Sequence, residues 1–227
     1  MGRIRYRSAA CLAAGTLACA AIVAVTTQPA AHAATTQCGS HCLDIYDQQD
    51  GLSDFVALDS GTVQTGLGTQ MATAARVSTE DFESLDEGTV ADFYNAGLVT
   101  SAVDAQFASD TAYEFLYDPD GQESNLCLGL ASNATAGEAV TLQTCGQYVR
   151  TVWIDAVGDE TDGYVPLVNA SESGNSTPLV LDANLIIREY PFSVSTDLIV
   201  NTLTKTNGTY VSWQLWRGQA GPQGVQS

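Results

Sequence analysis

The stretch from Leu126 to Trp153, LCLGLASNATAGEAVTLQTCGQYVRTVW, decides the predicted fold. It opens with a short apolar strand at residues 127–130, which is followed by a turn rich in Asn, Ala and Gly. Residues 140–145 alternate between apolar and polar side chains, which is typical of a second strand. The stretch is therefore predicted to be a β-hairpin, with Trp153 as a large apolar residue on a third strand.

Cys127 and Cys145 lie at the far ends of this hairpin, so strand pairing would bring them face to face. A disulfide there would stabilise the fold by about 3 kcal/mol in the chain-entropy model. Cys38 and Cys42 are the other two cysteines beyond residue 33. An even count in an exported chain is typical of two disulfides, and three connectivities are open. We favour Cys38–Cys42 and Cys127–Cys145.

Residues 1–33 have the features of a secretory signal peptide. Arg3, Arg5 and Arg7 form a basic start, residues 9–25 are apolar or small, and Ala31-His32-Ala33 is a small-x-small cleavage signal. A retained membrane anchor is the alternative, but it needs about twenty apolar residues, and Ala is only weakly apolar. We therefore expect a secreted, extracellular protein that is cut after Ala33 and does not insert into a membrane.

The chain beyond Ala33 is strongly acidic. It holds all 26 acidic residues but only five of the eight basic ones, which gives a formal charge of −21. Such a surface repels nucleic acid and anionic lipid, so neither is an expected partner. The simplest explanation of the acidity is solubility, and the alternative is an acidic patch that attracts a cation or a basic partner.

The pattern over the remaining chain predicts an all-β fold. Short runs rich in Val, Leu, Tyr and Thr recur between clusters of Asn, Asp, Gly, Ser and Thr, as in a barrel or a sandwich. About 190 residues suffice for one domain with a sizeable core. A short turn of helix is expected only within Asp92–Ala105, where Asn95-Ala96-Gly97 breaks the pattern.

The opening stretch resembles one repeat of a ricin-type β-trefoil, the R-type lectin family. The matching residues are Cys127-Leu128-Gly129, Gly137 through Leu142, Cys145 and the closing Thr151-Val152-Trp153, in which Thr151 replaces the family's Gln. A complete Gln-x-Trp motif occurs once, at Gln214-Leu215-Trp216. The resemblance implies a ricin B-like β-trefoil built from three repeats.

This resemblance divides the chain into a signal peptide, 1–33, an N-terminal arm, 34–54, a β-trefoil domain, 55–217, and a flexible tail, 218–227. The repeats are expected at about 55–117, 126–170 and 178–217, with Phe82, Trp153 and Trp216 as their core aromatic residues. These three residues are 71 and 63 positions apart. The spacing exceeds the usual repeat length of the family, so we expect long loops between the lobes.

The resemblance also implies where sugar would bind. In the family an Asp follows the Leu of the repeat's opening strand, and an aromatic side chain farther along stacks on the sugar. Asp59 and Asp182 match the Asp, whereas Gly129 occupies its place in the second repeat. The third repeat adds Tyr190 as the aromatic candidate. The expected ligand-binding residues are therefore Asp182, Tyr190 and Asp59, and the alternative for both Asp residues is a turn-capping role.

Catalytic and cofactor motifs are missing from the sequence. His41 is the only histidine beyond the leader, there is no Gly-x-Ser-x-Gly, and no phosphate loop or dinucleotide fingerprint occurs. No cofactor and no metal are therefore expected. The predicted function is a secreted, non-enzymatic module that binds carbohydrate or a cell-envelope glycan. The alternative is a structural or protein-interaction module on the same scaffold, and an acid glycoside hydrolase, which needs only two carboxylates, is a distant third.

Overall fold

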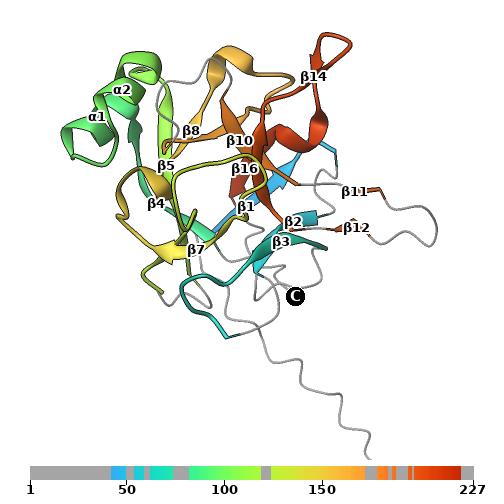
Figure 1. The fold of residues 1–227 in the computed structure, drawn as a ribbon, viewed down its shortest axis with the longest axis horizontal. Coiled ribbons are helices and arrows are strands. Elements are labelled where there is room, and N and C mark those ends of the chain that lie inside the picture. The colour runs from blue at the N-terminus through green and yellow to red at the C-terminus, as the bar shows by residue number, and fades with distance from the viewer. Residues whose placement is uncertain are drawn as a thin grey trace, which may run out of the picture. The chain divides into compact units, whose positions relative to one another are not determined.

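The computed structural model describes residues 42–49, 54–58, 62–73, 82–118, 124–171, 178–183, 186–187, 194–195 and 197–220 (Figure 1). All of them belong to the second of the two units into which the chain divides, Thr35–Ser227. Antiparallel strands make up most of the described elements. The predicted all-β class is confirmed.

Six strands form a closed barrel. In barrel order they are β1 (Cys42–Asp47), β4 (Phe82–Thr89), β5 (Thr111–Tyr117), β8 (Trp153–Asp155), β9 (Leu167–Asn169) and β16 (Trp216–Ala220). Every neighbouring pair in this order is antiparallel. Val165, two residues before β9, and Trp216 exchange two backbone hydrogen bonds of 2.9 and 2.8 Å, an antiparallel bridge that closes the ring of strands.

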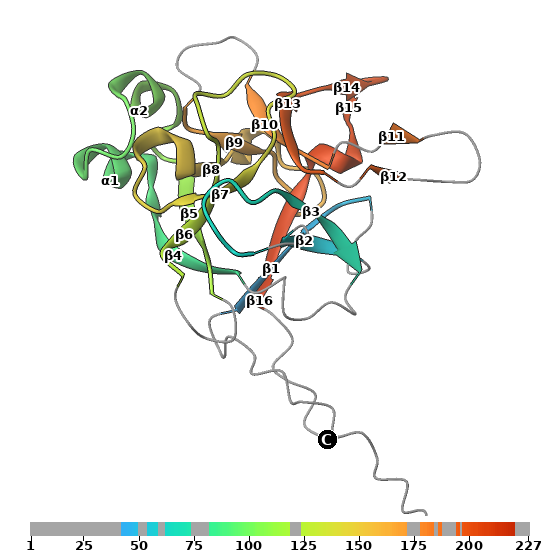
Figure 2. The same ribbon diagram turned by 60° about the horizontal axis from the view of Figure 1, so that its bottom comes forward.

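Three hairpins connect successive barrel strands. They are β2 (Asp54–Leu58) with β3 (Thr69–Thr73), β6 (Leu126–Gly129) with β7 (Thr141–Thr144), and β10 (Leu179–Asp182) with β13 (Ile199–Thr202). Figure 2 shows these hairpins beside the barrel strands that they connect. Each repeat thus consists of two barrel strands and one hairpin, which is the architecture of a β-trefoil.

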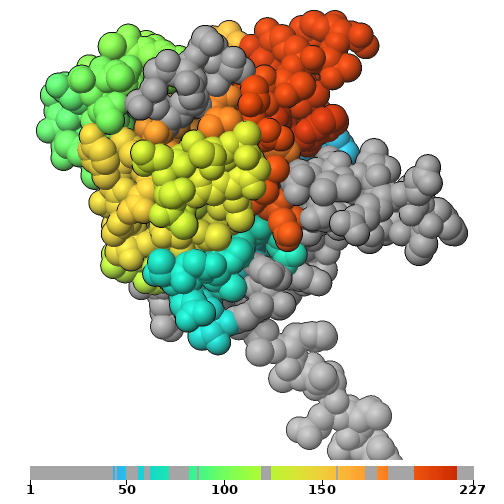
Figure 3. All heavy atoms as spheres, viewed as in Figure 1, coloured from blue at the N-terminus to red at the C-terminus, as the bar shows by residue number. Residues whose placement is uncertain are grey.

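The hairpins meet in a closed ring of three backbone hydrogen bonds. The amide of Thr69 donates to the carbonyl of Val140 (3.1 Å), Val140 donates to Leu198 (2.9 Å), and Leu198 donates to Thr69 (2.9 Å). In Figure 3 the teal segment 62–73, the yellow-green segment that precedes β7 and the red segment that follows 197 adjoin on the face toward the viewer. We call Thr69, Val140 and Leu198 the ring residues. All three are buried, and they define equivalent positions in the three repeats.

A large aromatic residue opens the second barrel strand of each repeat. Phe82, Trp153 and Trp216 are all fully buried, as predicted. The indole nitrogen of Trp153 donates to the carbonyl of Leu128 (2.9 Å), and that of Trp216 donates to the carbonyl of Leu181 (2.8 Å). Phe82 has no donor, so the first repeat lacks this bond between the core ring and its hairpin.

The repeats begin one strand earlier than the sequence analysis placed them. Residues 42–47, assigned to an N-terminal arm, form β1, and residues 218–220, assigned to the tail, form the end of β16. These two strands pair with each other from Leu43–Ala220 to Asp47–Trp216. Closing the barrel requires this pairing, because otherwise both strands would leave their backbone groups unpaired at a sheet edge. A local sequence pattern does not reveal it.

The expected long connections contain regular structure. Helices α1 (Val90–Asn95) and α2 (Ser101–Phe107) lie between β4 and β5, and they separate at the predicted break, where Gly97 has a φ of +78°. The hydroxyl of Thr89 accepts from the amide of Asp92, whose carboxylate accepts from the Thr89 amide, a capping box that starts α1. Among the described helices, none is long and apolar enough to cross a membrane.

The third repeat carries two further short hairpins, β11 (Ile186–Ile187) with β12 (Val194–Ser195) and β14 (Lys205–Thr206) with β15 (Thr209–Tyr210). Short 3₁₀ helices flank two barrel strands: η5 (Tyr148–Thr151) precedes β8, η6 (Val157–Asp159) follows it, and η7 (Ser212–Gln214) precedes β16. These insertions, together with α1 and α2, account for the wide spacing of the core aromatic residues.

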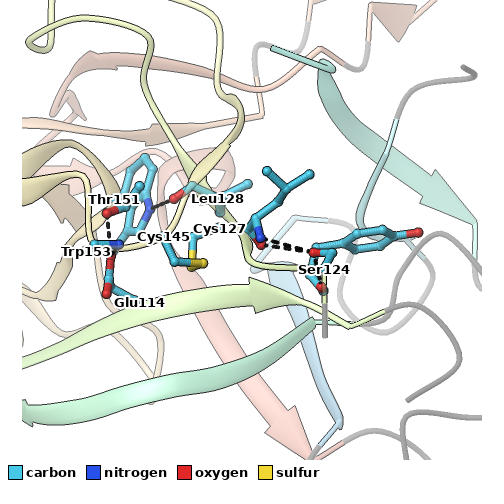
Figure 4. The surroundings of a disulfide bond; sticks show 10 residues. Glu114, Ser124, Cys127, Leu128, Cys145, Thr151 and Trp153 are labelled. Atoms are coloured by element: carbon cyan, nitrogen blue, oxygen red, sulfur yellow. Dashed lines mark hydrogen bonds between the residues drawn. A yellow bond between two sulfur atoms is a disulfide. The ribbon is translucent and has the colours of Figure 1, made fainter. Parts of the chain in front are cut away.

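The predicted Cys127–Cys145 disulfide is present, with the two Cα atoms 4.9 Å apart. Figure 4 shows the indole of Trp153 pointing toward the carbonyl of Leu128 beside this bond. Buried Glu114 on β5 accepts hydrogen bonds from the Gly146 amide (2.9 Å) and from the Thr151 hydroxyl. The disulfide and Glu114 therefore secure both ends of the segment 145–151. Cys38 and the side chain of Cys42 lie outside the described residues.

Trp153→Phe is expected to lower the free energy of unfolding by about 1–3 kcal/mol, because the buried carbonyl of Leu128 loses its donor. Urea denaturation of the variant and the parent measures the change. The matched control is Trp213→Phe, at a half-buried position, which should cost less than about 1 kcal/mol. Equal losses in the two variants would contradict a special role for the Trp153 bond.

Replacing both Cys127 and Cys145 by Ala is expected to cost about 2–5 kcal/mol of stability. Thermal unfolding of the double variant, compared with the parent, gives this value. Peptide mapping without reduction should also recover the two cysteines in one linked fragment. Recovery of either cysteine linked to Cys38 or Cys42 would refute the pairing.

Candidate functional sites

Asp182 is the one predicted sugar-site residue that the structure describes, and it ends β10 with an exposed fraction of only 2%. Its Oδ2 accepts a 2.7 Å hydrogen bond from Nε2 of Gln214, the first residue of the Gln-x-Trp motif. Gln214 also donates to the carbonyl of Thr202 (3.0 Å) and accepts from the amide of Thr204 (2.8 Å). Gln214 therefore fixes Asp182 and joins the third hairpin to the segment that precedes β16.

The second lobe has no space for a carboxylate at the equivalent position, Gly129. A β-carbon added there would lie 2.9 Å from both the carbonyl oxygen of Arg150 and the methyl group of Thr151. Thr151, which replaces the motif's Gln, donates its hydroxyl to Glu114 instead. The local packing explains why this repeat carries Gly.

The strand pairing of the first hairpin places Ala57, and not Asp59, at the position of Asp182. Asp182 pairs with Ile199, which follows the third ring residue, and Ala57 pairs with Gln70, which follows the first. Ala57 is fully buried. The resemblance aligned Leu58-Asp59 of the first repeat with Leu181-Asp182 of the third. This alignment is displaced by two residues, because apolar strand residues fit the sequence pattern equally well in either register. Asp59 and Tyr190 themselves lie outside the described residues.

A cavity of about 440 Å³ occupies the barrel end that lies away from the hairpins. All six barrel strands line it, together with Glu160, Gly163 and Val165 from the connection between β8 and β9. Its floor is apolar and includes Ile45, Phe115 and Leu167, which occupy equivalent positions in the three repeats, and Trp216. Polar side chains also line it: Glu87, Tyr113, Asp155, Glu160 and Arg217. We call this space the barrel-end cavity.

A hydrogen bond between two side chains organises the polar wall of this cavity. The hydroxyl of Tyr113 donates to Oδ2 of Asp155 over 3.3 Å. The pKa of Asp155 is raised to about 6, mainly by burial; the charges of Glu87 and Asp110 act in the same direction, and the bond from Tyr113 opposes them. Burial also raises the pKa of Tyr113 well above its ordinary range. Near neutral pH, Asp155 is thus an ionised, partly desolvated acceptor held in a fixed position.

Sequence reasoning missed the barrel-end cavity. Its residues come from six strands distributed over the whole domain, and none of them forms a local motif. A sequence signal that could have pointed to it is the alternation of aromatic residues along 113–117, which is typical of a strand whose rings face the core. Within the described ranges, no three His, Cys, Asp or Glu side chains are grouped to hold a metal ion.

Asp155→Asn is expected to stabilise the protein by up to about 3 kcal/mol at pH 8 and to have little effect at pH 3.5. A raised carboxyl pKa means that the folded state binds the proton more tightly, so stability falls as pH rises from about 4, the unfolded pKa, through about 6. Asn removes this charge penalty. Urea denaturation across this pH range tests the effect, and Asp162→Asn, at an exposed position in the neighbouring turn, is the control. An equal gain in the control would assign the effect to net charge alone.

No family model matches this chain, and no curated protein matches it. The chain is similar in structure to a designed threefold-symmetric protein, ThreeFoil, with 13% identity and a TM-score of 0.50 over 78% of this chain and 96% of that one. It is also similar to a mosquitocidal holotoxin (16% identity, TM-score 0.50, 78% of this chain and 17% of that one). A third neighbour is an exo-beta-1,3-galactanase from Clostridium thermocellum (11% identity, TM-score 0.51, 80% of this chain and 30% of that one). The last two proteins are therefore much longer than the part that matches. At these identities the likeness concerns the fold alone, and it supports the β-trefoil fold that the strand pairing shows.

Proposed function

We propose that this protein is a secreted, non-enzymatic binding module whose third lobe binds carbohydrate, with cell-envelope glycans as the ligand class. The observation that carries the proposal is the bond from Gln214 to Asp182. Among the three lobes, only the third has a carboxylate at this position, because Ala57 and Gly129 occupy it in the others. A carboxylate that a neighbouring amide holds in one orientation is a suitable acceptor for sugar hydroxyl groups.

The resemblance to R-type lectins and the structural neighbours favour carbohydrate over other ligand classes. One neighbour is, by its name, an enzyme that acts on a β-1,3-galactan, so β-galactosides are the first sugars to test. A non-enzymatic role follows from the scarcity of catalytic groups, since His41 is the single histidine beyond Ala33. Secretion follows from the leader pattern of residues 1–33.

The burial of Asp182 supports a second candidate, a protein-interaction or structural module. With 2% exposure, Asp182 contributes to the packing of the third lobe whether or not sugar binds. Sugar binding requires the surroundings of Asp182 to open, and such a shallow site should bind weakly. In the second candidate Asp182 is purely structural, and the trefoil surface contacts another protein.

The decisive experiment is an NMR titration of ¹⁵N-labelled protein with methyl β-galactoside and β-1,3-galactobiose. Binding in the range of about 0.1–10 mM is expected, because a shallow site buries few atoms and exchanges water for protein hydrogen bonds at little net gain. Asp182→Asn should abolish the shifts, because the negative acceptor is lost. This variant keeps the size of the side chain and one oxygen that can accept from Gln214.

Two further measurements separate the candidates. Asp182→Ala should lower the free energy of unfolding by about 1–3 kcal/mol, because Gln214 loses a buried partner, and this holds for both functions. Asp162→Asn, in the exposed turn beside the barrel-end cavity, should leave sugar binding unchanged. Shifts that persist in Asp182→Asn, or a parent that responds to no sugar, would favour the interaction module. New signals of hydrolysed galactobiose would contradict a non-enzymatic role.

A further inference from the structure

We propose that the barrel-end cavity is a second ligand site, which binds a compact organic cation with an apolar body, such as a primary amine carried on a ring. This proposal does not depend on sugar binding by the third lobe. The cavity lies at the end of the barrel away from the hairpins, whereas Asp182 belongs to a hairpin.

The size and the lining of the cavity suit a small molecule. A volume of about 440 Å³ falls within the range of about 300–1,000 Å³ that is typical of ligand pockets. Ile45, Phe115 and Leu167 provide one apolar residue from each repeat, and together they form a floor for an apolar ring. Because these three residues come from different lobes, closing the barrel creates the floor.

The layer of side chains next to the floor, toward the open end of the cavity, differs among the three repeats. Leu43, Tyr113 and Val165 occupy equivalent positions, since each pairs with the core aromatic residue of its repeat. Only the second repeat therefore contributes a polar group from this layer. At Gly218, an added β-carbon would lie 2.9 Å from Cδ1 of Leu43, so the third repeat leaves this part of the wall without a side chain. Glu87, Tyr113 and Asp155 therefore give the cavity a polar side on the neighbouring strands β4, β5 and β8, and Arg217 lines it from β16.

The charge of the cavity selects a cation. Three carboxylates, Glu87, Asp155 and Glu160, line it together with one guanidinium, Arg217. The charges that raise the pKa of Asp155 are those of the carboxylates Glu87 and Asp110. An entering ammonium group would relieve this repulsion and would receive a partly desolvated partner, which strengthens the attraction. The surplus of acidic over basic residues beyond Ala33 adds a long-range attraction for cations.

The bond between Tyr113 and Asp155 fixes the point at which the cation would bind. Oδ2 of Asp155 accepts from the Tyr113 hydroxyl, which limits rotation of the carboxylate. Tyr113 also stacks on Phe115, with ring centroids 5.5 Å apart and an angle of 13° between the ring planes. The acceptor and the apolar floor are therefore parts of one rigid arrangement, so a ligand can meet both without ordering the protein.

The test is an NMR titration of the full, ¹⁵N-labelled chain at pH 7.5 with three molecules of similar shape. They are benzylamine, a cation, benzyl alcohol, which is neutral, and benzoate, an anion. Benzylamine should shift the amide signals of Tyr113, Phe115 and Leu167, with a dissociation constant of about 0.1–10 mM. Benzyl alcohol should bind about fivefold more weakly, and benzoate more weakly still, because a single partly exposed charge contact is worth about this factor.

Matched variants locate the binding. Asp155→Asn should weaken benzylamine binding about fivefold, whereas Asp162→Asn, which removes the same charge from an exposed position nearby, should change it less than about twofold. Val165→Phe, at a half-buried position of the wall, should block entry and abolish binding of benzylamine without changing the charge. Asp182→Asn should have no effect.

The pH dependence provides an independent readout. Binding should weaken between pH 7.5 and pH 5, because Asp155 gains a proton while benzylamine and Arg217 remain charged. Other carboxylates also face this region and can contribute to the pH dependence: Glu87, Glu160 and Asp110. The difference in the pH dependence of binding between the parent and Asp155→Asn therefore measures the contribution of Asp155. An equal pH dependence in the parent and in Asp155→Asn would contradict the assigned role.

Several results would overturn the proposal. Equal binding of benzyl alcohol would show an apolar pocket without cation preference, and tighter binding of benzoate would show an anion site at Arg217. Shifts confined to residues outside the barrel end, or no shifts at about 50 mM of any probe, would exclude the site.

Discussion

The structure depends on the closed ring of hydrogen bonds among Thr69, Val140 and Leu198. Each ring residue donates one backbone bond and accepts one, so the buried backbone groups where the hairpins meet are all paired. A ring of this kind closes only when the three hairpins have matching registers. It therefore determines which residues are equivalent, and it places Ala57 and Gly129 where the third repeat has Asp182. Thr69 adds a second bond, from its hydroxyl to the Val140 carbonyl (2.8 Å).

The two ends of the barrel differ because only one of them is closed by this ring. At the hairpin end, Trp153 and Trp216 fill the interior and bond to hairpin carbonyls. At the other end, the barrel strands surround a cavity with an apolar floor, and Asp155 and Tyr113 line this space. Burial raises the pKa of Asp155, a cost to stability of the kind that accompanies many functional sites.

The repeats have diverged in the residues that contact their hairpins. The third keeps a carboxylate bound by Gln214, whereas the second keeps the aromatic residue but uses Thr151 to bond to Glu114. In the second lobe, the close packing at Gly129 and the Cys127–Cys145 disulfide therefore have a structural role. If sugar binds, it binds to a single lobe, and the other two serve as the scaffold that orients it.

The sequence by itself determined the all-β class, the hairpin with its Cys127–Cys145 bond, and the burial of Phe82, Trp153 and Trp216. Each of these follows from a local pattern: alternation, turn residues, or a large apolar side chain at a strand start. The tertiary structure alone decided the pairing of β1 with β16, the equivalence of Ala57 with Asp182, and the barrel-end cavity. The physical reason is that pairing and cavity formation join residues from distant repeats, and that the register depends on backbone bonds among three hairpins. Apolar alternation is compatible with several registers, and only closure of the barrel selects one of them.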